Sequence, residues 1–243
     1  MKKIKSKEKK IKVVILCGGK GTRIIEETQT KPKPMIMIGN EPVICHIMRI
    51  FMHYGYNDFV LAAGYKKQII YDYFKKSKKF PNVKVVNTGK ESMTGGRILR
   101  LKKYLKNEEL FFMTYGDGVS DVNIANLLTF HKKHKKIATV TAVHPPVRFG
   151  ELKINMSRVL KFEEKPQANA GWVNGGFFVL SKEIFRYIKN DKTIFEREPL
   201  EKISKKNQFM AFKHNNFWQC MDTLRDKILL NNLWKKKKAP WIK

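Results

Sequence analysis

The sequence is poor in acidic residues and cysteine. Against 50 Lys and Arg it has only 21 Asp and Glu, which gives a formal net charge of +29. Its three cysteines, Cys17, Cys45 and Cys220, show neither CxxC nor metal-site spacing. This low number excludes a dense disulfide framework and does not indicate a structural zinc site. We therefore expect reduced thiols in a cytoplasmic protein, with Cys17 and Cys45 buried in apolar runs.

Long hydrophobic runs are also missing. No stretch approaches the roughly 20 apolar residues that a membrane span needs. The apolar run Val13–Leu16 follows basic residues as in a signal peptide, but it is far too short and glycines interrupt it at once. We expect a soluble protein without a membrane partner.

Arginine is scarce for such a basic chain. Only nine residues are Arg, and the lysines spread over the whole chain with small clusters at 2–12, 132–136 and 235–238. Abundant Lys, Ile and Asn are also what an AT-rich genome produces. We expect a solvated basic surface and no nucleic-acid partner, with a basic nucleic-acid-binding protein kept as the less favoured alternative.

The remaining composition is that of a globular protein. The chain has 243 residues, of which 42% are hydrophobic and 12% aromatic, enough for one well-buried domain. No Ser/Gly/Pro-rich linker and no internal repeat divides it. We predict a single domain over residues 1–243, with a basic tail at residues 1–10 and a second tail in the last nine residues.

Short apolar runs alternate with helical patterns. A helix is predicted after Pro42, with Val43, Ile47, Ile50, Phe51 and Tyr54 on one face. A second is predicted over 121–134, with Asp121 as N-cap and with His131 and His134 among lysines and facing the solvent. Strands are predicted at 13–17, 58–64, 82–89, 109–117, 136–143 and 175–180, and a hairpin at 151–166.

Such alternation favours an α/β protein. We predict a Rossmann-like mixed, mostly parallel sheet with helices on both faces, and a small, more antiparallel C-terminal elaboration after about residue 145.

The segment ILCGGKGTRIIEETQTKPKPM, residues 15–35, follows the first predicted strand directly. Gly18, Gly19 and Gly21 allow a phosphate to approach the backbone closely, and Thr22 and Arg23 add a hydroxyl and a guanidinium fork. The spacing is neither the Walker pattern nor the Rossmann GxGxxG. An ordinary strand-to-helix turn is therefore the alternative interpretation.

Lys33 lies between two prolines, ten residues after Arg23. Pro32 and Pro34 stiffen the backbone and disfavour a regular helix, so the lysine is held on a rigid segment. Such stiffening is expected where an ammonium group must stay near a phosphate.

Two aspartates follow hydrophobic stretches. Asp117 ends a predicted strand between Gly116 and Gly118, and Asp222 follows an aromatic-rich stretch. Carboxylates in such positions suit a divalent metal ion that neutralises a triphosphate. The simpler interpretations are a turn residue at 117 and a helix N-cap at 222.

These motifs together resemble the sugar-1-phosphate nucleotidyltransferases, the family of nucleoside-diphosphate-sugar pyrophosphorylases with a GT-A-like fold. The resemblance rests on GGxGTR followed by KPKPM and extends from about residue 11 to the C-terminus. Within the family, SMTGGR combined with FWQxMDTLRDK is similar to the glucose-1-phosphate cytidylyltransferases. Further matching stretches are FMTYGDGVSD, RFGELKI, FEEKP, VNGGFFVL, FEREPL and KAPW.

The resemblance implies a nucleotidyl transfer from CTP to α-D-glucose 1-phosphate, which gives CDP-glucose for polysaccharide biosynthesis, in a cytoplasmic homo-oligomer. It implies Mg²⁺ as cofactor, held by Asp117 and Asp222, and Arg23 and Lys33 as catalytic residues. The implied nucleotide-binding residues are Leu16, Gly18, Gly19, Gly21, Thr22, Thr94, Gly95 and Gly96, and the implied sugar-phosphate-binding residues are Gly150, Glu164, Lys165, Asn174 and Gly175.

One feature departs from the family pattern. The cytidylyltransferases carry an insertion between the helix that ends near Phe74 and the strand that starts near Val83, where this chain has only a short connection. That region contributes to subunit contacts and lies near the nucleotide in the family. Another nucleoside triphosphate (NTP), or another sugar 1-phosphate such as a heptose or aminosugar phosphate, therefore stays open as an alternative.

Overall fold

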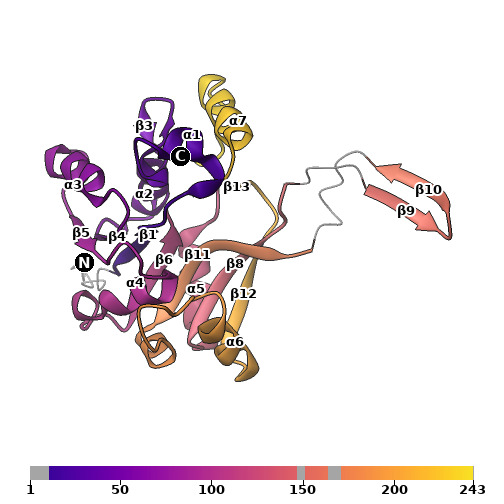
Figure 1. Cartoon of the computed structure of the whole chain (residues 1–243). Helices are drawn as coiled ribbons and strands as arrows, with labels where there is room; N and C mark the ends of the chain where they lie inside the picture. Colours follow the sequence, from indigo (N-terminus) through magenta and orange to yellow (C-terminus); the bar gives the residue numbers. More distant parts are fainter. Residues whose placement is uncertain (1–10, 147–150, 164–170, 243) are drawn as a thin grey trace, which may run out of the picture.

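A seven-stranded sheet forms the centre of the molecule, with strand order β12-β8-β11-β6-β1-β4-β5 (Figure 1). The computed structural model describes residues 11–146, 151–163 and 171–242. The strands of the sheet are β1 (Val13–Cys17), β4 (Phe59–Ala63), β5 (Val83–Asn87), β6 (Leu110–Tyr115), β8 (Ala138–Val143), β11 (Val173–Ser181) and β12 (Phe209–His214).

The sheet is mixed and mostly parallel, as predicted. β6, β1, β4 and β5 are parallel neighbours, and β12 is parallel to β8. Only β11 runs antiparallel to both of its neighbours, β6 and β8. All five residues of β1 are buried, which is why this strand is continuously apolar instead of alternating.

Helices cover both faces of the sheet. One apolar core includes residues of α2 (Val43–His53), α3 (Lys67–Lys76), α5 (Ile124–His134) and α7 (Leu224–Lys235). The other includes residues of α4 (Thr94–Arg100) and α6 (Glu198–Lys205). The helix predicted after Pro42 is α2, and Pro42 is its N-cap residue.

Several short elements complete the described part of the chain. A hairpin of β9 (Glu151–Asn155) and β10 (Arg158–Glu163) confirms the predicted antiparallel pair. The others are η1 (Thr22–Ile24), α1 (Ile25–Thr28), η2 (Lys33–Met35), β2 (Met37–Ile38), β3 (Glu41–Pro42), η3 (Lys102–Tyr104), β7 (Gly118–Ser120), η4 (Lys182–Tyr187) and β13 (Trp218–Cys220).

Two local predictions are wrong. Asn123, not Asp121, caps α5, because its side-chain oxygen accepts the backbone N–H of Asn126, while Asp121 lies 2.9 Å from His214 Nε2. His131 is buried against the sheet, with Nδ1 2.8 Å from Thr139 Oγ1. The burial of His131 could not be predicted from a lysine-rich stretch, because it depends on which face of α5 meets β8.

The C-terminal residues are not all a tail. Trp241 is 2% exposed, and its indole N–H donates to His46 Nδ1 at 3.2 Å. Its ring also stacks on Phe217 at a centroid distance of 5.4 Å. The sequence did not predict the burial of Trp241, because the run of lysines before it is typical of a solvated segment.

The carboxyl edge of the parallel strands positions the site. β1 and β6 are parallel, with Leu16 opposite Tyr115, so both strands end at the same edge. The glycine loop leaves β1 at this edge, and Asp117 follows β6 there. Open α/β sheets bind ligands at this edge because the loops expose backbone groups and side chains to a common space.

Candidate active site

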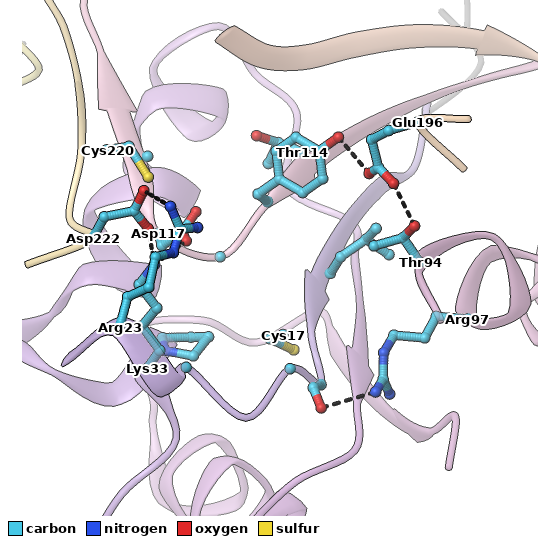
Figure 2. A pocket seen from close by; sticks show the side chains of 18 of the residues that line it. Cys17, Arg23, Lys33, Thr94, Arg97, Thr114, Asp117, Glu196, Cys220 and Asp222 are labelled. Atoms are coloured by element: carbon cyan, nitrogen blue, oxygen red, sulfur yellow. Dashed lines mark hydrogen bonds and ion pairs between the residues drawn. The ribbon is translucent and has the colours of Figure 1, made fainter. Parts of the chain in front are cut away.

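A cavity of about 590 Å³ opens at this edge. Figure 2 shows side chains from distant parts of the chain around it. Its lining includes Leu16, Cys17, Gly18, Gly19, Gly21, Thr22, Arg23, Lys33, Ser92, Thr94, Arg97, Tyr115, Asp117, Asn174, Gly175, Glu196, Trp218, Cys220 and Asp222.

A small two-stranded sheet brings Asp117 and Asp222 together. β7 begins directly after Asp117, and it pairs antiparallel with β13, with Gly118 opposite Cys220. The Met221 backbone N–H donates to the Asp117 carbonyl at 2.9 Å, which places Asp222 one residue further on. The two aspartates are therefore neighbours, although more than a hundred residues separate them.

Asp222 does not cap the helix that follows it. Thr223 is the N-cap residue of α7 and forms a capping box with Asp226. The Asp226 carboxylate also accepts the backbone N–H of Asp222 at 3.0 Å. The Asp222 carboxylate is therefore free of any capping role and lines the cavity. The simpler interpretation of Asp222 as a helix N-cap is wrong.

Lys33 lies between the two carboxylates. Its Nζ donates to Asp117 Oδ2 at 2.6 Å and to Asp222 Oδ1 at 2.5 Å. Arg23 Nη1 lies 2.6 Å from the other oxygen of Asp222, Oδ2. Lys33 is 7% exposed on its short η2 turn, whereas the Arg23 side chain is 73% exposed.

These contacts fix the charges of the cluster. Burial disfavours the Lys33 ammonium, but the Asp117 charge and the hydrogen bonds to both aspartates outweigh burial and raise the pKa of Lys33. Burial alone would raise the pKa of Asp222, but Lys33 and Arg23 outweigh it and hold that pKa below its usual value. The lysine is therefore charged and Asp222 ionised at neutral pH.

The donors at this point suit a hard divalent cation. One ligand atom each of Asp117, Cys220 and Asp222 lies within 4.8 Å of the others. Burial, followed by the nearby Asp117 charge, raises the pKa of the Cys220 thiol, so the thiol stays protonated in this protein. The carboxylate oxygens are then the available ligands, and oxygen is what Mg²⁺ prefers.

Arg97 fixes the glycine loop to the segment that precedes α4. Its Nη2 donates to the Gly18 carbonyl at 2.9 Å, and its Nη1 donates to Gly89 O at 2.7 Å and Thr88 Oγ1 at 3.0 Å. A Cβ on Gly18 would lie 2.1 Å from this guanidinium, so a larger residue there would displace Arg97 from its hydrogen bonds. Gly21 has a φ of +67°, the left-handed conformation that glycine adopts readily.

Across the cavity, Glu196 connects two other walls (Figure 2). Its carboxylate accepts the Tyr115 hydroxyl and the Thr94 hydroxyl, both at 2.6 Å. Asn174 Nδ2 donates to Tyr115 Oη at 3.2 Å. Burial and then the Glu196 charge raise the pKa of Tyr115 well above its usual value, so the phenol remains a hydrogen-bond donor.

Most residues predicted for the site lie around this cavity. Gly95 and Gly96, at the start of α4, do not line it, because they pack against the backbone of Thr193 and Asp191. Gly150, Glu164 and Lys165 lie outside the described residues. The sequence did not indicate a role for Glu196, Tyr115, Arg97 or Trp218, although the stretches FEREPL, FMTYGDGVSD, SMTGGR and FWQxMDTLRDK contain them.

The chain belongs to the nucleotidyl transferase family, whose model matches residues 12–226. The fold, the glycine loop and the carboxylate cluster thus belong to a nucleotidyltransferase, as the motifs predicted. The part of the chain that the structure describes contains no helix long and apolar enough to cross a membrane.

Particular relatives cover nearly the whole chain. The glucose-1-phosphate cytidylyltransferase of Salmonella typhimurium is 46% identical over 253 aligned positions, with 95% of this chain and 98% of the relative covered. The catalytic subunit beta of mannose-1-phosphate guanylyltransferase of Dictyostelium discoideum is 31% identical, with 92% of this chain and 64% of the relative covered.

Solved structures share the fold. HddC from Yersinia pseudotuberculosis complexed with GMP-PN has a TM-score of 0.74 at 25% identity, and covers 92% of this chain and 99% of its own. A UDP-glucose pyrophosphorylase complexed with UDP-glucose has a TM-score of 0.72 at 19% identity, covering 93% and 99%.

Proposed function

We propose that this nucleotidyltransferase transfers the cytidylyl group of CTP to α-D-glucose 1-phosphate, releasing pyrophosphate and giving CDP-glucose. The observation that carries the proposal is the cluster of Lys33, Arg23, Asp117 and Asp222 beside the glycine loop. The choice of CTP and glucose 1-phosphate rests on the Salmonella typhimurium relative, which matches nearly the whole chain.

The reaction joins a sugar-phosphate oxygen to the α-phosphorus of the nucleotide and breaks the bond to pyrophosphate. Little covalent chemistry is required of the protein, so positioning and charge neutralisation carry the catalysis. Arg23 and Lys33 supply the positive charge for the phosphate oxygens, and the glycine loop supplies backbone N–H groups.

Asp117 and Asp222 would hold a divalent metal ion, and we propose Mg²⁺. The ion would neutralise charge on the triphosphate when it is bound. The carboxylates and the glycine loop line the same cavity, so residues for both the phosphates and the ion face one space.

The sugar is proposed to lie toward Asn174 and Gly175, with the predicted Gly150, Glu164 and Lys165 completing its site. Both oxygens of Glu196 already accept hydroxyl groups in this region, and carboxylates suit sugar hydroxyls in the same way. Thr94, Gly95 and Gly96 are proposed for the nucleobase. Gly95 and Gly96 would act indirectly, because their lack of a side chain lets the first turn of α4 pack closely on Thr193 and Asp191 and so places Thr94 at the cavity.

A second candidate is a nucleotidyltransferase with another NTP or sugar. The connection between α3 and β5 is only Ser77–Asn82, and the alignment with the Salmonella typhimurium relative spans 253 positions against 243 residues here. That relative therefore has residues without a counterpart in this chain. The guanylyltransferase likeness makes GTP the competitor to test first.

The test is pyrophosphate release with each of four NTPs and a panel of sugar 1-phosphates. We expect turnover with CTP and glucose 1-phosphate to exceed every other pair. Asp117→Ala should abolish it, and Asp72→Ala, on the exposed face of α3, should not. A preference for GTP and a different sugar would establish the second candidate.

We further propose that the protein works in the cytoplasm as a homo-oligomer and that its product supplies the synthesis of polysaccharides. Sedimentation velocity of the purified protein measures the oligomeric state directly, and a single monomeric species would contradict that part of the proposal.

A further inference from the structure

The acidic side chains of the proposed metal site are already neutralised by the chain itself. Lys33 Nζ contacts one oxygen of each aspartate, and Arg23 contacts the second oxygen of Asp222. Two negative and two positive side chains leave no net charge at this point. A carboxylate pair attracts a divalent cation largely through its negative charge, so the pairing weakens that attraction.

The lysine also occupies the position that the ion would take. Its Nζ lies 2.6 and 2.5 Å from oxygens of the two aspartates, so it lies between them. An ion bound to both oxygens would come within a few ångströms of this ammonium, where two like charges repel strongly in a partly buried site. The ion and the ammonium therefore compete for the same oxygens.

Both cations also lie beside the loop that is proposed to bind the phosphates. A Cβ on Gly21 would lie 3.0 Å from Lys33 Cβ, so the lysine stem runs directly beside the glycine loop. The Arg23 side chain is 73% exposed and follows the loop by two residues. Phosphate groups on the loop would offer both side chains new anionic partners.

We propose that Lys33 and Arg23 couple metal binding to nucleotide binding, so that the divalent ion binds tightly only together with a triphosphate. The triphosphate attracts the two side chains, and the freed carboxylates then accept the ion. This inference rests on the proposed function, since it requires a nucleoside triphosphate on the glycine loop. Linkage makes the coupling reciprocal, so the ion strengthens nucleotide binding by the same factor.

The test is equilibrium dialysis of Mn²⁺ against the purified protein without nucleotide. Lys33→Met removes the competing charge, so we expect Mn²⁺ to bind roughly tenfold tighter or more than to the wild type. Lys33→Arg keeps the charge and should bind as weakly as the wild type. Lys31→Met is the matched control, because it removes a lysine of the same segment whose side chain pairs with Glu27 instead.

Arg23→Met guards against a folding defect in the Lys33 variant. Arg23 is exposed, so its removal should leave the fold intact and still give a smaller gain in Mn²⁺ affinity. With CTP on both sides of the membrane and no sugar phosphate, the wild type should bind Mn²⁺ far more tightly than without CTP. The advantage of Lys33→Met should then disappear.

The inference is overturned if neither Lys33→Met nor Arg23→Met binds Mn²⁺ more tightly than the wild type without nucleotide. The dialysis without nucleotide involves no turnover and no choice of NTP. If the Mn²⁺ affinities contradict the coupling, the wild type can still release pyrophosphate from CTP, and the proposed function stands. If the wild type turns over no NTP, the proposed function is contradicted, but the Mn²⁺ affinities remain valid measurements.

Discussion

At the residue scale, two buried cations organise the site in different ways. Lys33 is paired with carboxylates, whereas Arg97 is 5% exposed and donates only to neutral oxygens. The first charge is available to a ligand once the carboxylates release it. The second is fully used in fixing the glycine loop to the segment before α4.

We expect Lys33→Ala to lower kcat by about a hundredfold or more, because an ammonium at the phosphates is lost. The free energy of unfolding should change little by comparison, since the side chains of Asp117 and Asp222 are 22% and 15% exposed and water can solvate them. Steady-state kinetics and thermal unfolding of the same preparation check both statements. An unchanged kcat would contradict the role proposed for Lys33.

Arg97→Lys should lower stability by about 1–3 kcal/mol and raise the KM for the nucleotide. A lysine cannot donate simultaneously to Gly18, Gly89 and Thr88, because it lacks the planar fork of the guanidinium. Urea unfolding measures the first effect and initial rates the second. Arg100→Lys, at an exposed pair with Asp191, is the matched control and should change little.

At the element scale, the ends and faces of helices matter more than their lengths. The capping box of α7 supports the backbone of Asp222, and the buried face of α5 carries His131 against Thr139 of β8. These long-range positions of the helices could not be predicted from the sequence, although the helical patterns themselves are visible in it.

Asp226→Ala should cost about 1–2 kcal/mol of stability through loss of the cap. It should also weaken Mn²⁺ binding in the presence of CTP, because the Asp222 backbone loses its partner. Thermal unfolding and dialysis measure the two effects. Thr129→Ala, on the exposed face of α5, is the control. A stability loss with unchanged Mn²⁺ affinity would show that the capping box does not position Asp222.

Burial, followed by the charge of His134, lowers the pKa of His131 to about 4. Because the pKa of His131 is higher in the unfolded chain, the unfolded chain takes up the proton at a higher pH than the folded protein does. This contribution to stability is therefore complete above about pH 6.5 and is lost as the pH falls toward 4. We expect a loss of up to about 3 kcal/mol in the wild type.

His131→Gln should make this part of the pH profile flatter, with the amide replacing the imidazole beside Thr139. Urea unfolding between pH 7 and pH 4 measures the profile of both proteins. Equal slopes would mean that another group dominates acid unfolding.

At the scale of the whole molecule, the net charge of +29 and the cavity are separate features. The lysine clusters at 132–136 and 235–238 do not line the cavity. Lysine-to-glutamine substitution of both clusters should therefore leave kcat and KM within about twofold, apart from a change in ionic-strength dependence. A large loss of activity, or salt-sensitive DNA or RNA binding that disappears with these lysines, would give the charge a function.

The sequence by itself predicted six of the seven strands of the central sheet, the β9–β10 hairpin and the helices α2 and α5, because buried strands are continuously apolar and amphipathic helices repeat their apolar residues every three to four positions. It did not predict β12. It also indicated the residues of the glycine loop, Lys33 and both aspartates, since local spacing and family motifs are written along the chain. Their functional roles stay proposals that the variants above test.

Only the tertiary structure decided which of these groups meet. Lys33 and Asp222 are 189 positions apart, and the pairing of β7 with β13 joins them. The same holds for Tyr115 with Glu196, for His131 beneath the sheet and for Trp241 against His46. A sequence pattern records which face of an element is apolar, but the partner on that face follows from long-range packing.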